Sequence, residues 1–434
     1  MTPSARLSAA IEILADIEAR RRPAGDALKD WGLSHRFAGS GDRAGIAGLV
    51  YDALRRRASS AYVMGEATPR AVLLGMLMRE RGLDREGIAK LLDGSRFAPE
   101  PLTDAEAAAL DGASLDAAPA HIVGDYPEWL DPHFATVFGD ERADEGAALA
   151  ARAPVDLRVN TLKGNRDQAL ADLSDLAPEP TRWSPLGLRI KLDAGAKSPP
   201  IHAEHAFIKG WIEIQDEGSQ LAALLAGAKP GEQVVDLCAG AGGKTLALAA
   251  AMENQGQIYA TDTDKRRLAP IHERLDRSGA RNVQIRPPKS VGNQLADLEG
   301  RMDLVLIDAP CTGTGSWRRN PDAKWRMRPG ALEQRMKDQT EILDRAVSLL
   351  KPNGRIAYVT CSVLDEENSG QIRAFLGRQT GFKPIPPADV MGAALGERAF
   401  MFRQAVLASD EGLLMTPRRT DTDGFFVSIL ARSA

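Results

Sequence analysis

The sequence predicts an α/β protein in which a doubly wound, mostly parallel sheet follows an all-α domain and a small α+β domain. From about residue 206 onward, short β-rich runs such as QVVDLC, QIYATD, LVLID and RIAYVT alternate with turn residues and helical patterns. These runs lack strict polar–apolar alternation, which is typical of parallel strands buried on both faces. At 434 residues the chain is long enough for two or three domains, each with its own core.

The first predicted domain, residues 1–115, is helical. Leu7, Ile11 and Leu14 recur at helical spacing, and the stretch RAVLLGMLMRERG continues the pattern. The polar, Ala-rich stretch 99–121 is predicted to be a linker.

The second predicted domain, residues 122–205, has an α+β pattern. The strand-like runs VDLRVNTL and GLRIKL flank a helix-like NRDQALADLSDL. Residues 206–434 then form the doubly wound domain. Ligands of such sheets bind at the carboxyl ends of the strands. The motifs of this domain that could bind a ligand or react all follow strand ends.

Composition restricts the class of protein. A net charge of −4 means that a nucleic-acid partner would need local basic patches, for which Arg20–Arg22 and Arg55–Arg57 are candidates. We interpret both first as solvated helix faces, with RNA contact as the alternative. Three cysteines cannot form a disulfide framework, and the N-terminus is unlike a signal peptide. No long apolar run and no cysteine–histidine ligand spacing occur. We expect a cytoplasmic monomer without a membrane span or a metal.

A glycine-rich loop, DLCAGAGGKT, follows the first of the predicted parallel strands. It ends like a P-loop, but Cys238 stands where that motif requires a glycine. Asp262 ends the next strand, at the position where an acidic side chain typically holds ribose hydroxyls, although it could also be a helix N-cap. A ribose-bearing ligand without a large phosphate group fits both features, so the sequence predicts S-adenosyl-L-methionine as the cofactor.

Two of the three cysteines, Cys311 in DAPCTGTG and Cys361 in YVTCS, stand just past strand ends. A thiol beside loop amides can have a depressed pKa and attack as a thiolate. Addition of a thiolate to C6 of cytosine would make C5 nucleophilic toward a methyl donor. Asp308 could then stabilise the adduct at N3, and the second thiol could help it break down. The alternative for a single cysteine is a small buried hydrophobe, which is our interpretation of Cys238.

The chain resembles the NOL1/NOP2/Sun family of RNA 5-methylcytosine methyltransferases, in particular its bacterial Fmu/Sun type. The resemblance rests mainly on LIDAPCTGTGSWRRNPDAKW, YVTCSVLDEENSGQI, IEIQDEGSQLAALL and DGFFVSIL. The N-terminal SGDRAGIAGLVYDALRRR is similar to the NusB-like RNA-binding domain of that family. The resemblance implies a Rossmann-like class I methyltransferase domain and small-subunit ribosomal RNA as the substrate.

The resemblance also implies roles for individual residues. Cys361 corresponds to the nucleophile, Cys311 to the cysteine that assists product release, and Asp308 to an aspartate between cofactor and base. Lys244 would face the base as well as the cofactor, and Asp262 would hold the ribose. The implied cofactor site comprises Cys238, Ala239, Gly240, Ala241, Gly242, Gly243, Lys244, Asp262 and Asp308.

Several positions depart from the family pattern. Gly240 and Ala241 replace an Ala-Pro pair, Pro288 stands where an acidic residue near the adenine is expected, and Leu304 replaces a basic or small residue. These departures keep open a second hypothesis, a catalytically weak RNA-binding or ribosome-assembly factor.

Two further alternatives concern the substrate. The same chemistry could act on tRNA or another RNA, and a DNA cytosine methyltransferase would also use it, although the intact TCSVLDEEN and the helical N-terminus argue against DNA. The stretch SWRRNPDAKWRMR suits phosphate contact and base stacking, but a structural role for Trp317 and Trp325 is an equal alternative.

Overall fold

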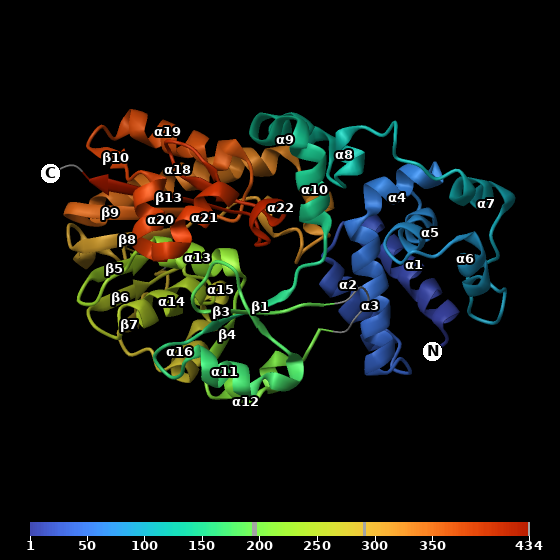
Figure 1. The fold of residues 1–434 in the computed structure, drawn as a ribbon, viewed down its shortest axis with the longest axis horizontal. Coiled ribbons are helices and arrows are strands. Elements are labelled where there is room, and N and C mark those ends of the chain that lie inside the picture. The colour runs from blue at the N-terminus through green and yellow to red at the C-terminus, as the bar shows by residue number, and fades with distance from the viewer. Residues whose placement is uncertain (193–197, 290–291, 433–434) are drawn as a thin grey trace. The chain divides into compact units, whose positions relative to one another are not determined.

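The structure of the chain is a computed structural model that describes residues 1–192, 198–289 and 292–432. The chain forms two compact units, which are considered separately (Figure 1). The helical unit consists mainly of Met1–Ala153 and Ser316–Arg328, and the α/β unit of Pro154–Lys191, Pro199–Gly315 and the chain from Pro329 onward. The chain therefore leaves the α/β unit after Gly315, contributes thirteen residues to the helical unit and returns at Pro329.

The helical unit is built around a core of aliphatic side chains that includes Ile13, Val50 and Leu73. Proline follows the N-capping threonine of both α1 and α5, where its fixed φ suits the first helical turn. Its helices are α1 (Pro3–Arg20), α2 (Ala24–Ser34), α3 (Ser40–Arg55), α4 (Arg57–Met64), α5 (Pro69–Arg79), α6 (Arg85–Leu91), α7 (Asp104–Asp111), α8 (Ala120–Val123), α9 (Asp131–Phe138), α10 (Arg142–Ala150) and α17 (Ala323–Arg326).

Helix α7 lies within the stretch that its composition predicts to be a linker, so that prediction is wrong for this segment. Thr103 and Glu106 form a capping box at its start, in which each side chain accepts a hydrogen bond from the other residue's backbone N–H. Glu106 also pairs with Arg70 of α5, with 2.6 Å between Oε1 and Nε. A run of alanines provides the helix propensity, and the ion pair ties the helix to the unit.

Residues Ser316–Arg328, which we call the return segment, are held in the helical unit by buried polar contacts. The Lys324 amine is fully buried and donates to the carbonyls of Arg55 and Asp125, at 2.9 and 2.6 Å. Trp317 is buried and stacks on Phe134, with 5.9 Å between ring centroids. Of the two interpretations of this tryptophan, the structural one is therefore confirmed.

The second basic cluster is also largely structural. Arg55 is buried and donates to the carbonyl of Arg318 in the return segment, and burial lowers the pKa of its guanidinium to about 10. Arg56 pairs with Glu80, at 2.8 Å between Nε and Oε2. Only Arg57, which pairs with Glu18 on the surface, remains available to an external partner.

The α/β unit contains a small antiparallel sheet with strand order β2-β3-β1-β4. Its core is formed by Leu157, Val159 and Leu188 of the strands together with Ala169 of α11. The elements are β1 (Val155–Val159), α11 (Arg166–Asp172), β2 (Glu179–Pro180), β3 (Gly187–Ile190), α12 (His205–Ile208) and β4 (Ile212–Ile214). The predicted small α+β pattern is present here.

The large sheet has the order β11-β12-β13-β9-β8-β5-β6-β7, with β10 paired to β13. Strands β5 to β9 are parallel, and β13 runs antiparallel to β9. The elements are α13 (Glu217–Leu225), β5 (Gln233–Asp236), α14 (Gly243–Ala251), β6 (Gln257–Ala260), α15 (Lys265–Leu268), α16 (Ile271–Ser278), β7 (Val283–Ile285), β8 (Met302–Asp308), α18 (Pro329–Leu349), β9 (Leu350–Thr360), α19 (Ser369–Arg378), β10 (Phe382–Pro384), α20 (Pro387–Leu395), α21 (Ala399–Ala405), β11 (Leu407–Ala408), β12 (Leu413–Met415), α22 (Pro417–Thr420) and β13 (Phe425–Arg432).

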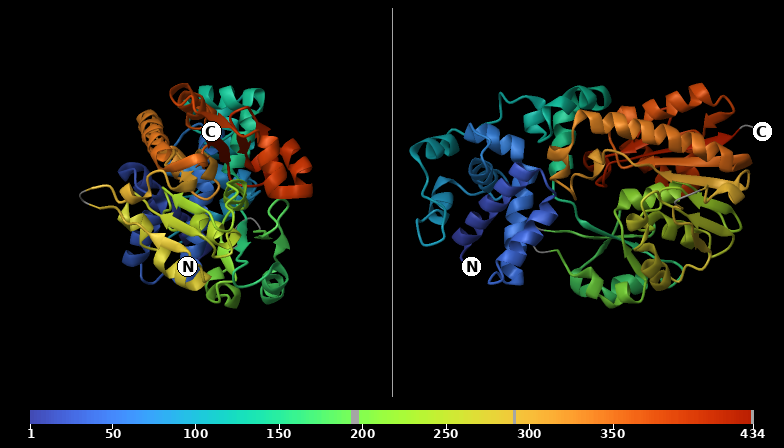
Figure 2. Two further views of the ribbon diagram at one scale, coloured as in Figure 1. Left: turned by 90° about the vertical axis from the view of Figure 1, so that its left-hand side faces the viewer. Right: turned by 180° about the vertical axis from the view of Figure 1, so that it is seen from behind.

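Helices cover both faces of this sheet (Figure 2). On one face, α13, α14, α20 and α21 pack against alternate strand residues such as Val234, Leu304 and Ala357. On the other face, α18 lies against β8 and β9. The β5, β6, β8 and β9 strands coincide with the runs QVVDLC, QIYATD, LVLID and RIAYVT, so the predicted doubly wound, mostly parallel sheet is confirmed.

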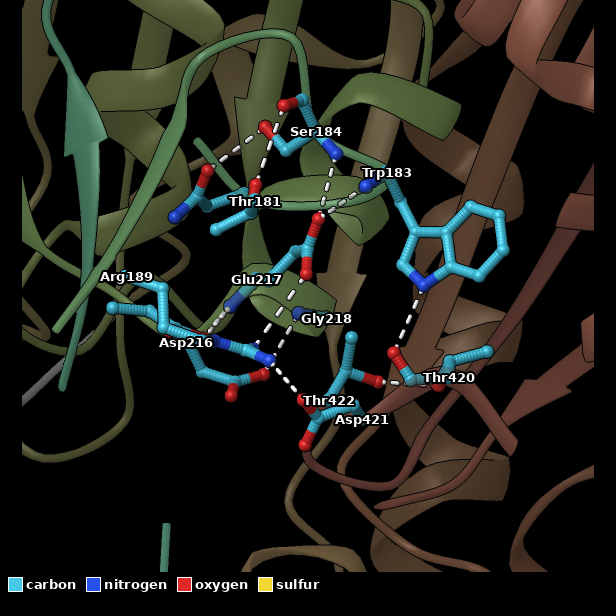
Figure 3. A network of polar contacts seen from close by, with 12 residues as sticks. Thr181, Trp183, Ser184, Arg189, Asp216, Glu217, Gly218, Thr420, Asp421 and Thr422 are labelled. Carbon is cyan, nitrogen blue, oxygen red and sulfur yellow. Dashed lines mark hydrogen bonds and ion pairs between the residues drawn. The ribbon is translucent and has the colours of Figure 1, made fainter. Parts of the chain in front are cut away.

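A buried polar network joins the small sheet to the large one (Figure 3). The carboxylate of Glu217, at the start of α13, accepts hydrogen bonds from the backbone N–H groups of Trp183 and Ser184, at 2.7 and 2.8 Å. Arg189 of β3 pairs with Asp156 of β1, at 2.7 Å between Nε and Oδ1, and lies 3.6 Å from Glu217 Oε2. One carboxylate thus satisfies two amides and faces one guanidinium.

We predict that Glu217→Ala lowers the free energy of unfolding by about 3–5 kcal/mol, because it leaves two buried amides without an acceptor and removes a charge that faces Arg189. Denaturant unfolding of the full chain measures this. Glu273→Ala, at an exposed position on α16, is the matched control and should change stability by less than about 0.5 kcal/mol. Equal midpoints for the two variants would contradict a stabilising role for the network.

Candidate functional site

The two loops that carry Cys311 and Cys361 begin at neighbouring strand ends. β8 and β9 pair in parallel with Asp308 opposite Val359. Strand β8 ends at Asp308 and β9 ends at Thr360, and a loop follows each strand. Both cysteines therefore lie at the carboxyl edge of the sheet. The sequence predicts this edge as the ligand site of a doubly wound sheet.

The structure brings the two thiols together, with 3.4 Å between their sulfur atoms. Both side chains are half-buried. The hydrogen bond with Cys361, together with burial, raises the pKa of the Cys311 thiol well above its usual value. The expectation of a depressed pKa is therefore wrong for Cys311.

Glu367 holds the two cysteine loops in place. Its Oε1 accepts hydrogen bonds from the Thr312 backbone N–H, at 2.8 Å, and from the Gln339 side chain, at 3.0 Å. Tyr358 of β9 donates to its backbone carbonyl at 2.7 Å. The carboxyl group is fully buried, and burial raises its pKa. It thus links the loop after β8 to the segment after Cys361 and to α18.

Backbone contacts also bring these loops close to the start of β13. Gly315 N–H donates to the carbonyl of Cys361 at 2.9 Å, and Gly424 N–H donates to the carbonyl of Gly315 at 2.8 Å. A Cβ atom at Gly315 would lie 2.1 Å from the Gly424 carbonyl oxygen. The approach is therefore possible only because residue 315 has no side chain.

An ion pair lies at the same edge of the sheet. Lys244, in the first turn of α14, pairs with Asp308 at the end of β8, with 2.7 Å between Nζ and Oδ2. The lysine is buried, the aspartate is one-third exposed, and the ammonium group lies 4.9 Å from the centroid of the Phe425 ring. Asp308 therefore presents an oriented carboxylate beside the cysteine loop.

The glycine-rich loop connects β5 to α14. Gly242 has φ +87°, and a Cβ there would lie 2.5 Å from Ile271, so only glycine fits this turn. Asp262, after β6, is buried, and its carboxylate accepts hydrogen bonds from the backbone N–H groups of Gly240 and Asp264, at 3.0 and 2.9 Å. The N-cap of α15 is Asp264 and not Asp262. The N-cap alternative for Asp262 is therefore wrong.

Two groups beneath this loop are strongly desolvated. Burial raises the pKa of Asp236 to about 7, and this carboxyl accepts a hydrogen bond from the Thr245 hydroxyl at 2.7 Å. Burial also raises the pKa of Cys238 well above its usual value, as expected for a cysteine that acts as a small hydrophobe. Its side chain is not a nucleophile in this setting.

The structure therefore gathers Lys244, Asp308, Cys311 and Cys361 at one sheet edge, with the glycine-rich loop and Asp262 at the ends of β5 and β6. Pro288, which follows β7, occupies the position where an acidic residue is expected. The sequence did not predict a role for Glu367, although this residue belongs to the motif TCSVLDEEN. An acidic residue followed by a polar run gives no sign that it will be buried.

Comparisons with known proteins show the family to which the chain belongs. Residues 222–431 match the family described as 16S rRNA methyltransferase RsmB/F, and residues 126–194 match the ferredoxin-like domain of RsmF/B-like methyltransferases. The chain belongs to the RsmB/F family. The resemblance to the Fmu/Sun type of the NOL1/NOP2/Sun family is thereby confirmed.

Individual RsmB/F-type relatives extend the match. The ribosomal RNA small subunit methyltransferase B of Salmonella arizonae is 36% identical over 58% of this chain and 58% of its own length. That of Cronobacter sakazakii is 33% identical over 71% of this chain and 66% of its own length. The chain thus spans less than two thirds of the length of these relatives. The solved structure of PH0851 superposes with a TM-score of 0.70, at 26% identity and 99% coverage of both chains.

Within residues 1–192, 198–289 and 292–432, no helix is long and apolar enough to span a membrane. The same ranges hold no group of three or more histidine, cysteine or acidic side chains placed to bind a metal ion.

The buried Asp236 should make the stability of this RsmB/F-type unit depend on pH. Its pKa of about 7 in the folded state lies above its ordinary value of 3.8, so the folded state binds the proton more tightly. The free energy of unfolding should therefore fall as pH rises from about 4 to about 7, with a slope from this group of at most about 1.4 kcal/mol per pH unit. Asp236→Asn should remove this slope in denaturant titrations across the window. The exposed control Asp276→Asn should keep it; parallel slopes for wild type and Asp236→Asn would contradict the assignment.

Proposed function

We propose that this chain transfers a methyl group from S-adenosyl-L-methionine to C5 of a cytosine in small-subunit ribosomal RNA, through a covalent adduct between Cys361 and C6. The observation that carries the proposal is the distance of 3.4 Å between the sulfur atoms of Cys311 and Cys361, beside the oriented Lys244–Asp308 pair. The names of the relatives support ribosomal RNA as the substrate. The paired thiols support C5 of cytosine as the methylated position.

The residues at the ends of β5 and β6 suit the cofactor. The loop from Cys238 to Lys244 has glycines at its tight turn, so its backbone can approach a ligand closely, and it leads into α14, whose N-terminus carries free N–H groups. Asp262 places a buried carboxylate beside Gly240, suited to ribose hydroxyls. S-adenosylmethionine supplies an electrophilic methyl group, which the activated C5 accepts.

Cys361 performs the attack. Its thiolate forms a bond to C6 of the cytosine, and the electron pair of the C5–C6 double bond becomes available at C5. The family resemblance supports this division of roles, because Cys361 in the TCS motif corresponds to the nucleophile and Cys311 in DAPC to the cysteine that assists product release. After C5 has accepted the methyl group, a base from solvent takes the C5 proton, and the electron pair of that C–H bond re-forms the C5–C6 double bond. The bond between C6 and sulfur breaks in the same step, and Cys361 departs as a thiolate beside the Cys311 thiol.

Asp308 and Lys244 position and stabilise the ring. Asp308 lies three residues before Cys311, where its carboxylate can accept a hydrogen bond from N3 when that nitrogen carries a proton in the adduct. Lys244 fixes the orientation of that carboxyl through the contact of 2.7 Å and keeps its charge balanced in a partly desolvated site. Glu367 supports the reaction through the loops, which it holds at Thr312 and Gln339. Its carboxyl group also adds to the hydrogen bond with Cys361 and to burial in raising the pKa of the Cys311 thiol.

We predict that Cys361→Ala lowers methyl incorporation from labelled donor into small-subunit ribosomal RNA by more than about 1,000-fold, because the nucleophile is lost. Cys311→Ala should instead accumulate a covalent protein–RNA adduct, visible as a denaturation-resistant band, because release is impaired. The double variant is the control and should form no adduct. An adduct in Cys361→Ala would assign the attack to Cys311, and methylation of DNA or tRNA in preference to ribosomal RNA would overturn the proposed substrate.

We also predict that Asp262→Ala weakens binding of S-adenosylmethionine by about tenfold or more, because two charge-assisted hydrogen bonds to the ribose are lost. Isothermal titration calorimetry of the full chain measures this. Asp264→Ala is the matched control: it removes the exposed N-cap of α15 and should leave the affinity within about twofold. Equal losses in the two variants would mean that Asp262 only supports the loop.

A further inference from the structure

The helical unit contains a pocket that the proposed chemistry does not use. It has a volume of about 330 Å³ and lies between α1, the junction of α3 and α4, the start of α5 and the return segment. We call it the Trp325 pocket and define it by Arg21, Arg57, Asp322, Trp325, Arg326 and Arg328. Its volume is at the lower end of the range of small-molecule sites, roughly 300–1,000 Å³.

The pocket has an apolar and aromatic wall. Leu14, Ile17 and Leu54 line it from the helices. The Trp325 indole is fixed at this wall, because its Nε1 donates to the Leu54 carbonyl at 2.6 Å and the Arg57 guanidinium lies 5.4 Å from its ring centroid. A planar aromatic ligand can pack against such a wall without disturbing the core.

The rim of the pocket carries an excess of positive charge. Four arginines line it, against the two carboxylates of Glu18 and Asp322. Arg57 pairs with Glu18 at 2.6 Å, and Arg326 pairs with Asp322 at 3.0 Å. Arg21 and Arg328 are exposed, and within the part of the chain that the structure describes neither makes an ion pair. Two guanidinium groups are thus left for an anion.

From this geometry we infer that the Trp325 pocket binds one unpaired nucleotide of an RNA substrate, with the base against the Trp325 wall and the flanking phosphates on Arg21 and Arg328. Arginine forks match phosphate oxygens, and single-stranded RNA is held by such a combination of cations and aromatic surface. The inference rests on the proposed function only in taking RNA as the ligand. The pocket is a binding site separate from the cysteines.

Neutralising the two free arginines tests the inference. The full-length variant Arg21→Gln/Arg328→Gln should bind a fluorescein-labelled, short single-stranded RNA about tenfold more weakly than wild type in fluorescence anisotropy. Between about 50 and 200 mM salt, the slope of log affinity against log salt should fall by about 1.4, as expected for the loss of two single-strand phosphate contacts. Both positions are exposed, so the variant should melt at the wild-type temperature.

Arg36→Gln/Lys90→Gln is the matched control, because it removes two exposed charges of the same unit outside the pocket. It should keep affinity within about twofold and leave the salt slope unchanged. Equal losses in both double variants would show that only general electrostatic attraction acts, and the inference would fail. Unchanged RNA affinity of the pocket variant, in a wild type that binds and methylates RNA, overturns the inference alone. A wild type that binds S-adenosylmethionine but neither binds nor methylates RNA overturns the proposed function and the inference together.

Discussion

The parallel pairing of β8 with β9 determines the chemistry that this chain can perform. Neighbouring parallel strands lie about 4.8 Å apart, so loops that leave them at the same edge bring their first side chains within contact distance. Here the register sets Asp308 against Val359, and the two cysteines follow within three residues. If either strand continued further before its loop began, the two thiols would lie too far apart for contact.

The polar groups that support the fold and the site fall into two kinds. Glu217, Glu367 and Asp236 are buried carboxyl groups that hold backbone or hydroxyl groups in place, and burial raises the pKa of each. Lys244 and Asp308 instead form an ion pair that is partly open to solvent. The first kind fixes backbone segments at a cost in desolvation, and the second leaves an oriented carboxylate at the carboxyl edge of the large sheet. The residues that hold the backbone in place are therefore different from the residues whose charges face solvent.

Much of this arrangement could be predicted from the sequence, because it depends on local patterns. Short β-rich runs predicted the parallel strands, and topology alone then places Asp262, Asp308 and Cys361 at one edge. The pKa of Cys311 could not be predicted, because it depends on a contact fifty residues away in the chain. Likewise, Lys324 stands in a run of charged and aromatic residues typical of a solvated loop, and only tertiary contacts bury it. Composition also suggested a linker where a capping box and an ion pair stabilise α7.

The return segment has a consequence for how the protein is made. Chains grow from the N-terminus, and domains usually fold as soon as they emerge. Here the helices up to α10 emerge long before Lys324, whose amine satisfies the carbonyls of Arg55 and Asp125. These two carbonyls therefore lack the lysine amine until translation has passed β8 and reached the return segment. Because the helical unit is made of separate stretches of the chain, truncation at any single boundary cannot release it intact.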